Sequence, residues 1–341
     1  MSPACDPPRG LHGIMAGRGD PYAVLTPLRL RLLRALHGGA TLADLAAEAG
    51  LSPGRVRAEL APLRAAHLVA GDGDRPRPAF VVAPAAETRR VAAHADEVGR
   101  LLATRLLDRW PAIEAAYREL ALAAALPLSE VAFLLVGDRI LDVGLLDALA
   151  RDGRLMPPAP ARPSPGHPDA RYYLWLIEGE HDQLGRYGQR ATTLPWPGWE
   201  LLTFGQYTRG DAPNTARDAL EAAARAAVAA GDGGMPDALA TYLGVPLVGR
   251  EDAGRWWALA RERADDLLTV YREQEPALRR LYGELGASAY LPADFGEFFC
   301  WYDHLAYAAA IDALAASGVF VIRPERYTAA VWQEAPVESR F

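Results

Sequence analysis

Residues 41–82 carry the most constraining pattern in this chain of 341 residues. Thr41 precedes apolar residues at helical spacing, and Gly50 stands where a helix C-cap glycine belongs. Ser52 then offers a new N-cap, and Pro53 takes the first helical position, where its missing N–H costs nothing. The pattern predicts two short helices joined by a tight turn.

The second helix is expected to have one buried and one exposed face. Val56, Leu60 and Leu63 repeat at i, i+4 and i+7, so they face the core. Pro62 lies within the same helix and predicts a kink or an early end. The residues expected to face outward are Gly54, Arg55, Arg57, Ala58 and Glu59.

A hairpin is expected next. Residues 67–69 lead into an extended run that turns at Gly71-Asp72-Gly73-Asp74 and returns through Phe80, Val81 and Val82, with Arg75 and Arg77 near the tip. Helix, turn, helix and hairpin in this order predict a winged helix-turn-helix, a module that places one short helix in the major groove of DNA.

The same residues resemble a known family. The string Ser52-Pro53-x-x-Val56-x-x-x-Leu60-x-x-Leu63-Arg64-x-Ala66-x-Leu68-Val69 resembles the recognition helix and following strand of ArsR-like winged-helix regulators. Leu30-x-x-Leu33-x-x-Leu36 is similar to the helix that opens that domain, so the resemblance covers about residues 21–85. Residues 41–49 contain no cysteine, so the thiolate metal site of the arsenic and cadmium sensors is not expected there, and we predict no metal.

The resemblance implies contacts with double-stranded DNA. Arg55, Arg57, Ala58 and Glu59 fall where family members address base edges, and Arg75 and Arg77 would hold the flanking backbone. The full set of residues expected at the DNA is Ser52, Gly54, Arg55, Arg57, Ala58, Glu59, Arg75 and Arg77.

Charge favours this interpretation. Residues 21–90 hold ten arginines and six acidic residues, a net charge of +4, whereas the whole chain carries −7. Residues 91–341 therefore carry −11, because residues 1–20 are neutral. A basic module on an acidic body directs that module toward a polyanion. The alternative is that the winged helix serves as a protein-docking or dimerisation piece.

The composition of the chain limits its location and its covalent cross-links. No run of 18 apolar residues is present, so no membrane span is expected, and residues 1–20 lack the apolar stretch of a signal peptide and are expected to form a disordered tail. Only Cys5 and Cys300 occur, which predicts no disulfide framework and a cytoplasmic location.

The predicted fold class is α+β, with the winged helix-turn-helix at residues 21–85, a helical linker at 86–125 and a larger mixed α/β domain at 126–341. The linker, which Pro111 is expected to bend or restart, would either hold a homodimer together or pack as a connector within one protomer. In the large domain, 131–136 is a strand candidate with Asp138 at its end. Residues 172–177 and 199–204 suggest an antiparallel sheet with aromatic pairs.

Helices are expected at about 213–230, 252–284 and 296–317. Two groups of residues in the large domain have chemical potential. The first is Glu178, Glu180, His181 and Asp182, which would hold a cation or supply an acid and a base, although a solvated acidic loop would contain the same residues. The second lies on the helix around residue 300, where an aromatic pocket wall and an aromatic core helix are both open interpretations. The residues expected to bind a ligand are Glu178, His181, Glu297, Cys300, Trp301, His304 and Tyr307.

Two functions are consistent with these observations. One is a dimeric transcription regulator whose C-terminal domain binds a small-molecule effector. The other is a hydrolase or transferase that carries a winged helix as a docking domain. No catalytic residue is assigned in either case, and the cofactor is unknown.

Overall fold

The computed structural model describes residues 10–71, 73–164, 166–180, 183, 185–206, 211–230, 236–291, 294–322 and 328–333, without the side chains of 206 and 211–217. The fold class is α+β, as predicted. The chain forms two compact units, each built from separate segments. The first comprises Met1–His94, Asp152–Leu184 and Gln274–Asp303, and the second comprises Ala95–Arg151, Gly185–Glu273 and His304–Phe341.

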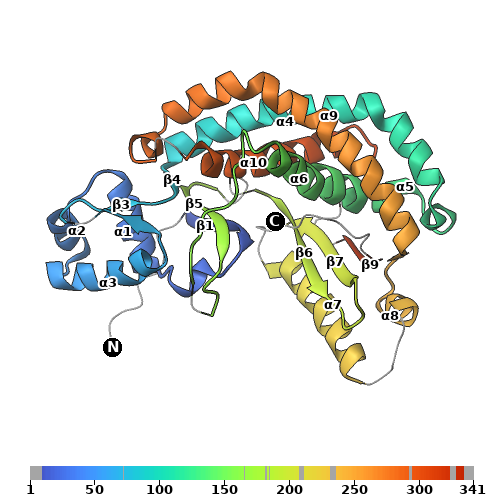
Figure 1. Cartoon of the computed structure of the whole chain (residues 1–341), viewed down its shortest axis with the longest axis horizontal. Helices are drawn as coiled ribbons and strands as arrows, with labels where there is room; N and C mark the ends of the chain where they lie inside the picture. The colour runs from blue at the N-terminus through green and yellow to red at the C-terminus, as the bar shows by residue number, and fades with distance from the viewer. Residues whose placement is uncertain are drawn as a thin grey trace. The chain divides into compact units, whose positions relative to one another are not determined.

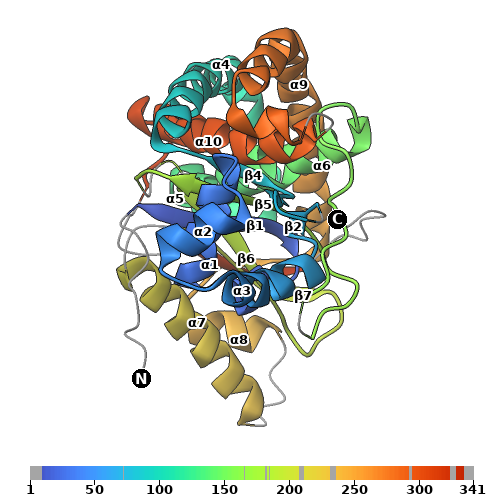
Figure 2. The same cartoon turned by 90° about the vertical axis from the view of Figure 1, so that its left-hand side faces the viewer.

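The first unit contains three short helices, a small hairpin and a three-stranded sheet (Figures 1 and 2). The helices are α1 (Pro27–His37), α2 (Leu42–Ala49) and α3 (Pro53–Ala65), after the 3₁₀ turn η1 (Pro21–Ala23). The hairpin pairs β2 (Val69–Ala70) with β3 (Arg77–Pro78), antiparallel. The sheet has the order β1 (Leu11–Arg18), β5 (Arg171–Glu178), β4 (Val81–Ala83).

Strand β5 organises this unit. It pairs antiparallel with β1 along eight residues and parallel with β4, and its residues 172–177 are buried. Its Tyr172, Leu174 and Leu176 join a core that includes Leu33, Leu60 and other apolar residues of α1–α3. Strand β5 therefore belongs to the core of the three helices. Burial of each such side chain contributes about 1.5–3 kcal/mol to stability.

Two expectations are wrong in this unit. Within the predicted disordered tail at residues 1–20, residues 11–18 form β1; residues 1–9 lie outside the described residues. The hairpin returns through Arg77–Pro78 rather than residues 80–82, because residues 81–83 pair with β5 as β4. Both errors arise from pairing with a strand that lies far along the sequence.

The second unit is built on a four-stranded sheet. Its order is β6 (Tyr187–Thr193), β7 (Trp199–Gln206), β9 (Thr328–Gln333), β8 (Leu247–Val248), in which only the β8–β9 pair is parallel. Helices α7 (Asp211–Ala229) and α8 (Pro236–Leu243) lie beside the sheet, and Ala224 and Leu239 pack with Leu201 and Val331 in a small core (Figure 1). The predicted sheet that joins 172–177 to 199–204 is wrong, because β5 and β7 belong to different sheets.

The remaining helices of the second unit include an unusual one. The 3₁₀ turn η2 (Ala121–Ala124) and α5 (Leu128–Ala132) precede a buried π-helix, η3 (Phe133–Asp142), and α6 (Val143–Asp152) follows it. The predicted strand at 131–136 is therefore wrong. A continuous apolar run does not distinguish a buried strand from a buried helix. A Cβ at Gly137 would lie 3.0 Å from the Phe204 ring, so a larger residue here would require that ring to shift.

Three long helices contribute residues to both units. They are α4 (Ala85–Arg118), α9 (Arg250–Gly283) and α10 (Phe295–Ala316), and the turn η5 (Gly286–Ala289) lies between the last two. The predicted helices at 213–230, 252–284 and 296–317 are confirmed within two residues at each end. Pro111 does not divide α4, which continues through it to Arg118. Val98, Leu102 and Leu106 of α4 are buried, whereas Leu101 of the same helix is exposed. No helix in the described part of the chain has both the length and the apolar character that crossing a bilayer requires.

Candidate nucleic-acid interface

Helix α3 is held at its start by its own sequence. The Ser52 Oγ accepts a hydrogen bond from the Arg55 N–H at 3.2 Å, and Pro53 occupies the first position. The preceding Gly50 is left-handed, with φ of 63°, where other residues would be strained. In α2, Thr41 and Asp44 form a capping box, in which each side chain bonds the backbone N–H of the other residue. These hydrogen bonds hold the Asp44 pKa below its usual value, and Arg75 adds a smaller effect in the same direction.

The exposed face of α3 contains most of the predicted residues. Val56, Leu60 and Leu63 are fully buried, whereas Ser52, Gly54, Arg55, Arg57 and Ala58 are exposed. The helix does not end early at Pro62 but continues to Ala65. In Figure 2, α2 and α3 lie toward the viewer.

Glu59 departs from the expectation. It was expected to face outward with the arginines, but it is only 8% exposed. Its two carboxylate oxygens pair with Arg29 of α1 and Arg55 of α3. Arg29 helps to remove this carboxylate from solvent, and no local pattern predicts the pair because the two residues lie on different helices.

The hairpin carries two further arginines. Gly71 and Gly73 have φ of 82° and 94°, which the tight connection requires, and Asp72 lies outside the described residues. Arg75 is exposed, whereas Arg77 lies on β3 itself and is partly buried. Arg77 points inward: its guanidinium lies within 4 Å of where a Cβ on Gly39 would be.

A hollow of about 230 Å³ lies between α3 and the hairpin connection. It is lined by Leu42, Arg57, Arg64, Gly73 and Asp74. The Arg64 Nε and the Arg77 Nη1 are buried without a hydrogen-bond partner in the described structure.

The predicted ligand residues on α10 have structural partners. Glu297 is fully buried, and its carboxylate accepts hydrogen bonds from both terminal guanidinium nitrogens of Arg162 and from the N–H of Leu174. Burial raises the Glu297 pKa, and Arg162 acts in the opposite direction. Trp301 donates to the Gln183 carbonyl at 3.1 Å, and Cys300 is buried.

Residues 304–316 of α10 belong to the second unit. There the Tyr307 hydroxyl donates to the Tyr187 carbonyl at 2.6 Å, and the His304 and Tyr307 rings are 5.4 Å apart. Glu178 is bound by Arg34 of α1 in the first unit, and His181 and Asp182 lie outside the described residues. Ligand binding by these residues stays a prediction.

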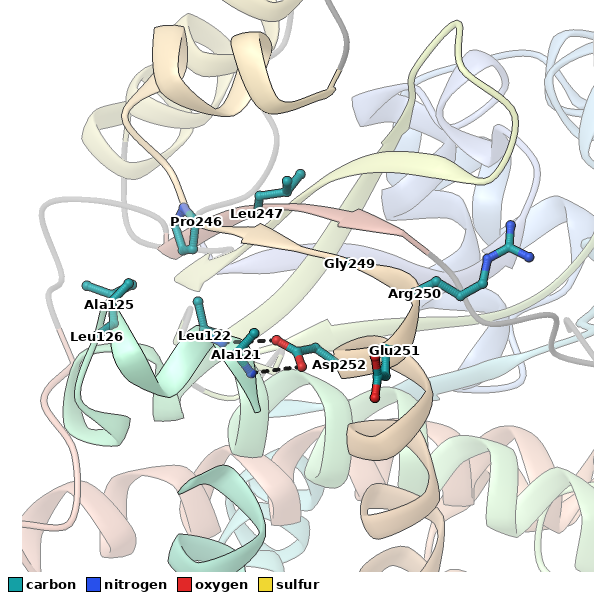
Figure 3. A pocket seen from close by; sticks show the side chains of 10 residues that line it. All are labelled: Ala121, Leu122, Ala125, Leu126, Pro246, Leu247, Gly249, Arg250, Glu251 and Asp252. Carbon is teal, nitrogen blue, oxygen red and sulfur yellow. Dashed lines mark hydrogen bonds between the residues drawn. The ribbon is translucent and has the colours of Figure 1, made fainter. Parts of the chain in front are cut away.

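A second hollow, which the sequence did not indicate, lies in the second unit (Figure 3). Its volume is about 480 Å³, and it is widely open to solvent. The lining comes from residues 121, 122, 125 and 126 on one side and residues 246, 247 and 249–252 on the other. Asp252 is not available to a ligand, because its oxygens accept the N–H groups of Ala121 and Leu122 at 3.0 Å. Arg250 extends away from the apolar side chains in Figure 3, which leaves a mainly apolar lining.

A buried ion pair lies close to the sheet of the same unit. Asp138, fully buried, is 3.2 Å from Arg139, whose guanidinium lies over the rings of Trp257 and Trp332. Burial raises the Asp138 pKa to about 6, although Arg139 opposes the shift. Asp138 was expected at the end of a strand, but it lies within η3.

No cluster of three histidine, cysteine or acidic residues suited to a metal ion occurs among the described residues. Comparisons with family models, with curated proteins and with solved structures found no match for this chain.

Proposed function

We propose that this chain is a DNA-binding transcriptional regulator of the ArsR-like winged helix-turn-helix kind, with α3 as the helix that enters the major groove. The observation that carries the proposal is the exposed face of α3 beside the hairpin. Arg57 of α3 and Arg75 of the hairpin are exposed, and neither forms an ion pair with an acidic residue of the described structure. Unpaired arginines are suited to phosphate and guanine.

Charge supports the same assignment. The net charge of +4 on residues 21–90 contrasts with −7 for the whole chain. An acidic remainder disfavours contact of other surfaces with DNA, so the polyanion would approach through α3 and the hairpin.

In this proposal the second unit senses a small molecule, and the regulator works as a homodimer that reads two half-sites. The hollow of about 480 Å³ supports an effector that is mainly apolar, because six of its lining residues are alanine, leucine or proline. Effector binding would change DNA affinity only to the extent that the two conformations bind the effector differently.

The test is the salt dependence of binding to random-sequence duplex DNA. We expect the chain to retard the duplex and the logarithm of its affinity to fall linearly with the logarithm of salt concentration. The variants Arg57→Ala and Arg75→Ala should each lower the magnitude of the slope by about 0.9, the value of one phosphate contact. Arg100→Ala, which changes an exposed arginine of α4, is the matched control and should leave the slope unchanged. No retardation at low salt, or equal slopes in all four proteins, would contradict the proposal.

A further inference from the structure

Glu59 stands between two arginines that belong to different helices. Its Oε2 lies 3.1 Å from the Arg29 Nε, and its Oε1 lies 2.6 Å from the Arg55 Nη2. Each oxygen therefore accepts one guanidinium, and the three side chains together carry a net charge of +1.

The two arginines differ in how firmly they are held. The Arg29 side chain is 17% exposed and donates a second hydrogen bond, from Nη1 to the Val24 carbonyl at 3.0 Å. Arg29 therefore fixes Glu59 against α1. The Arg55 side chain is 63% exposed and has Glu59 as its charged partner in the described structure. Through Glu59, the position of α1 therefore restrains the side chain of Arg55, which is otherwise exposed to solvent.

Arg57 lies on the same helix without this restraint. It is exposed and forms no ion pair with an acidic residue of the described structure, and it lies two residues further along α3 than Arg55. A free arginine adapts to a phosphate, because any direction of approach suffices. A held arginine suits a base edge, because two parallel hydrogen bonds to the O6 and N7 of guanine require a fixed direction. An arginine that is already ordered also loses less side-chain entropy when it binds.

We propose that Glu59 is a positioning residue that orients Arg55 to read a guanine in the major groove, while Arg57 contacts the phosphate backbone. The inference rests on the proposed function and adds to it the kind of base that α3 recognises. Glu59 itself does not touch the DNA. Its role is to hold one nitrogen of Arg55 and leave the other donors directed outward.

Selection of binding sites from a random-sequence duplex pool tests the inference, with the wild type compared with Arg55→Ala, Arg55→Lys, Glu59→Gln and Glu59→Asp. The wild type should prefer guanine at one position by about tenfold or more. Arg55→Ala and Glu59→Gln should both lose the preference at that same position. Glu59→Asp, which keeps the carboxylate, should recover part of it.

Affinity for random duplex separates positioning from a general loss of binding. Glu59→Gln removes a negative charge, so its affinity for random duplex should stay equal or rise while the preference falls. Arg55→Lys keeps the charge but has no planar fork, so it should retain the salt slope and lose the preference. This variant leaves the Glu59–Arg29 pair intact and serves if Glu59→Gln does not fold. Arg57→Ala should weaken binding to every sequence and keep the preference.

The results of these experiments separate failure of the inference from failure of the proposed function. A guanine preference that survives in Glu59→Gln or Arg55→Lys overturns the inference. Salt-sensitive binding by the wild type without any sequence preference also overturns it but leaves the proposed function standing. Absence of salt-sensitive binding overturns the proposed function and the inference together.

Discussion

The charged residues in the core of the second unit have consequences for stability. Asp138 is fully buried within η3, and burial raises its pKa from 3.8 to about 6. The folded state therefore keeps the proton to a higher pH than the unfolded chain does. The free energy of unfolding should fall as the pH rises from about 4 to about 6, and should stay lower above that range.

Asp138→Asn tests this effect. A pKa difference of about two units corresponds to about 3 kcal/mol, which is an upper bound for the fall. The variant cannot lose a proton at this position, so its unfolding free energy should change less with pH across the same range. Denaturant unfolding at several pH values measures the difference. Asp237→Asn, an exposed aspartate at the start of α8, is the matched control and should follow the wild type. Equal pH profiles for Asp138→Asn and the wild type would show that the Asp138 pKa is not raised.

At the scale of the element, strand β1 shows why a sequence does not reveal every pairing. Its residues 11–18 contain two glycines and little alternation, so they resemble a tail. The partner β5 lies more than 150 residues away, and pairing at that distance leaves no local pattern. By contrast, α2 and α3 were predicted with their caps, because capping depends on residues that are neighbours in the chain.

The candidate site shows the same division. The exposed arginines of α3 follow from helical periodicity alone, whereas the burial of Glu59 depends on Arg29 of another helix. The sequence also missed the hollow in the second unit, because η2 and the start of α9 are separated by about 130 residues. Local signals thus predicted α2, α3 and the later long helices, and contacts between distant segments decided the strand pairing and which side chains remain available.

Gly17 and Gly13 provide a matched test of β1. A Cβ on Gly17 would lie 2.7 Å from the Arg171 carbonyl oxygen, and its φ is +124°. A Cβ on Gly13 would meet no atom closer than 3.8 Å, and its φ is not positive. Gly17→Ala should therefore lower the free energy of unfolding by about 1–3 kcal/mol or more, and Gly13→Ala should be nearly neutral. Denaturant unfolding of both variants measures this. If Gly17→Ala is as stable as Gly13→Ala, then β1 is not paired with β5 in this register.

At the scale of the whole molecule, the three helices that carry the proposed DNA interface do not form a unit that ends at residue 85. Both outer strands of their sheet, β1 and β4, pair with β5 at residues 171–178. Their core also includes Tyr172, Leu174 and Leu176 of that strand. The chain therefore has to return from residue 152 before the first unit is complete.

This organisation predicts how fragments of the protein behave. A fragment of residues 10–94 keeps α1, α2, α3 and the hairpin but leaves β1 and β4 without the strand between them. Each buried apolar side chain of β5 contributes about 1.5–3 kcal/mol. Loss of the strand would therefore remove a large part of the free energy of unfolding of a small domain. The fragment should therefore unfold without a cooperative transition, as followed by circular dichroism. Addition of peptides of residues 152–184 and 274–303 should restore cooperativity and protect amide hydrogens of β1 and β4 from exchange, because these segments supply β5 and the rest of the first unit. A peptide of residues 152–184 with Leu174→Asp and Leu176→Asp is the control and should not restore cooperativity.

Cooperative unfolding of the fragment alone would show that the interface helices fold independently of β5. The β1-β5-β4 sheet would then be dispensable for presenting α3.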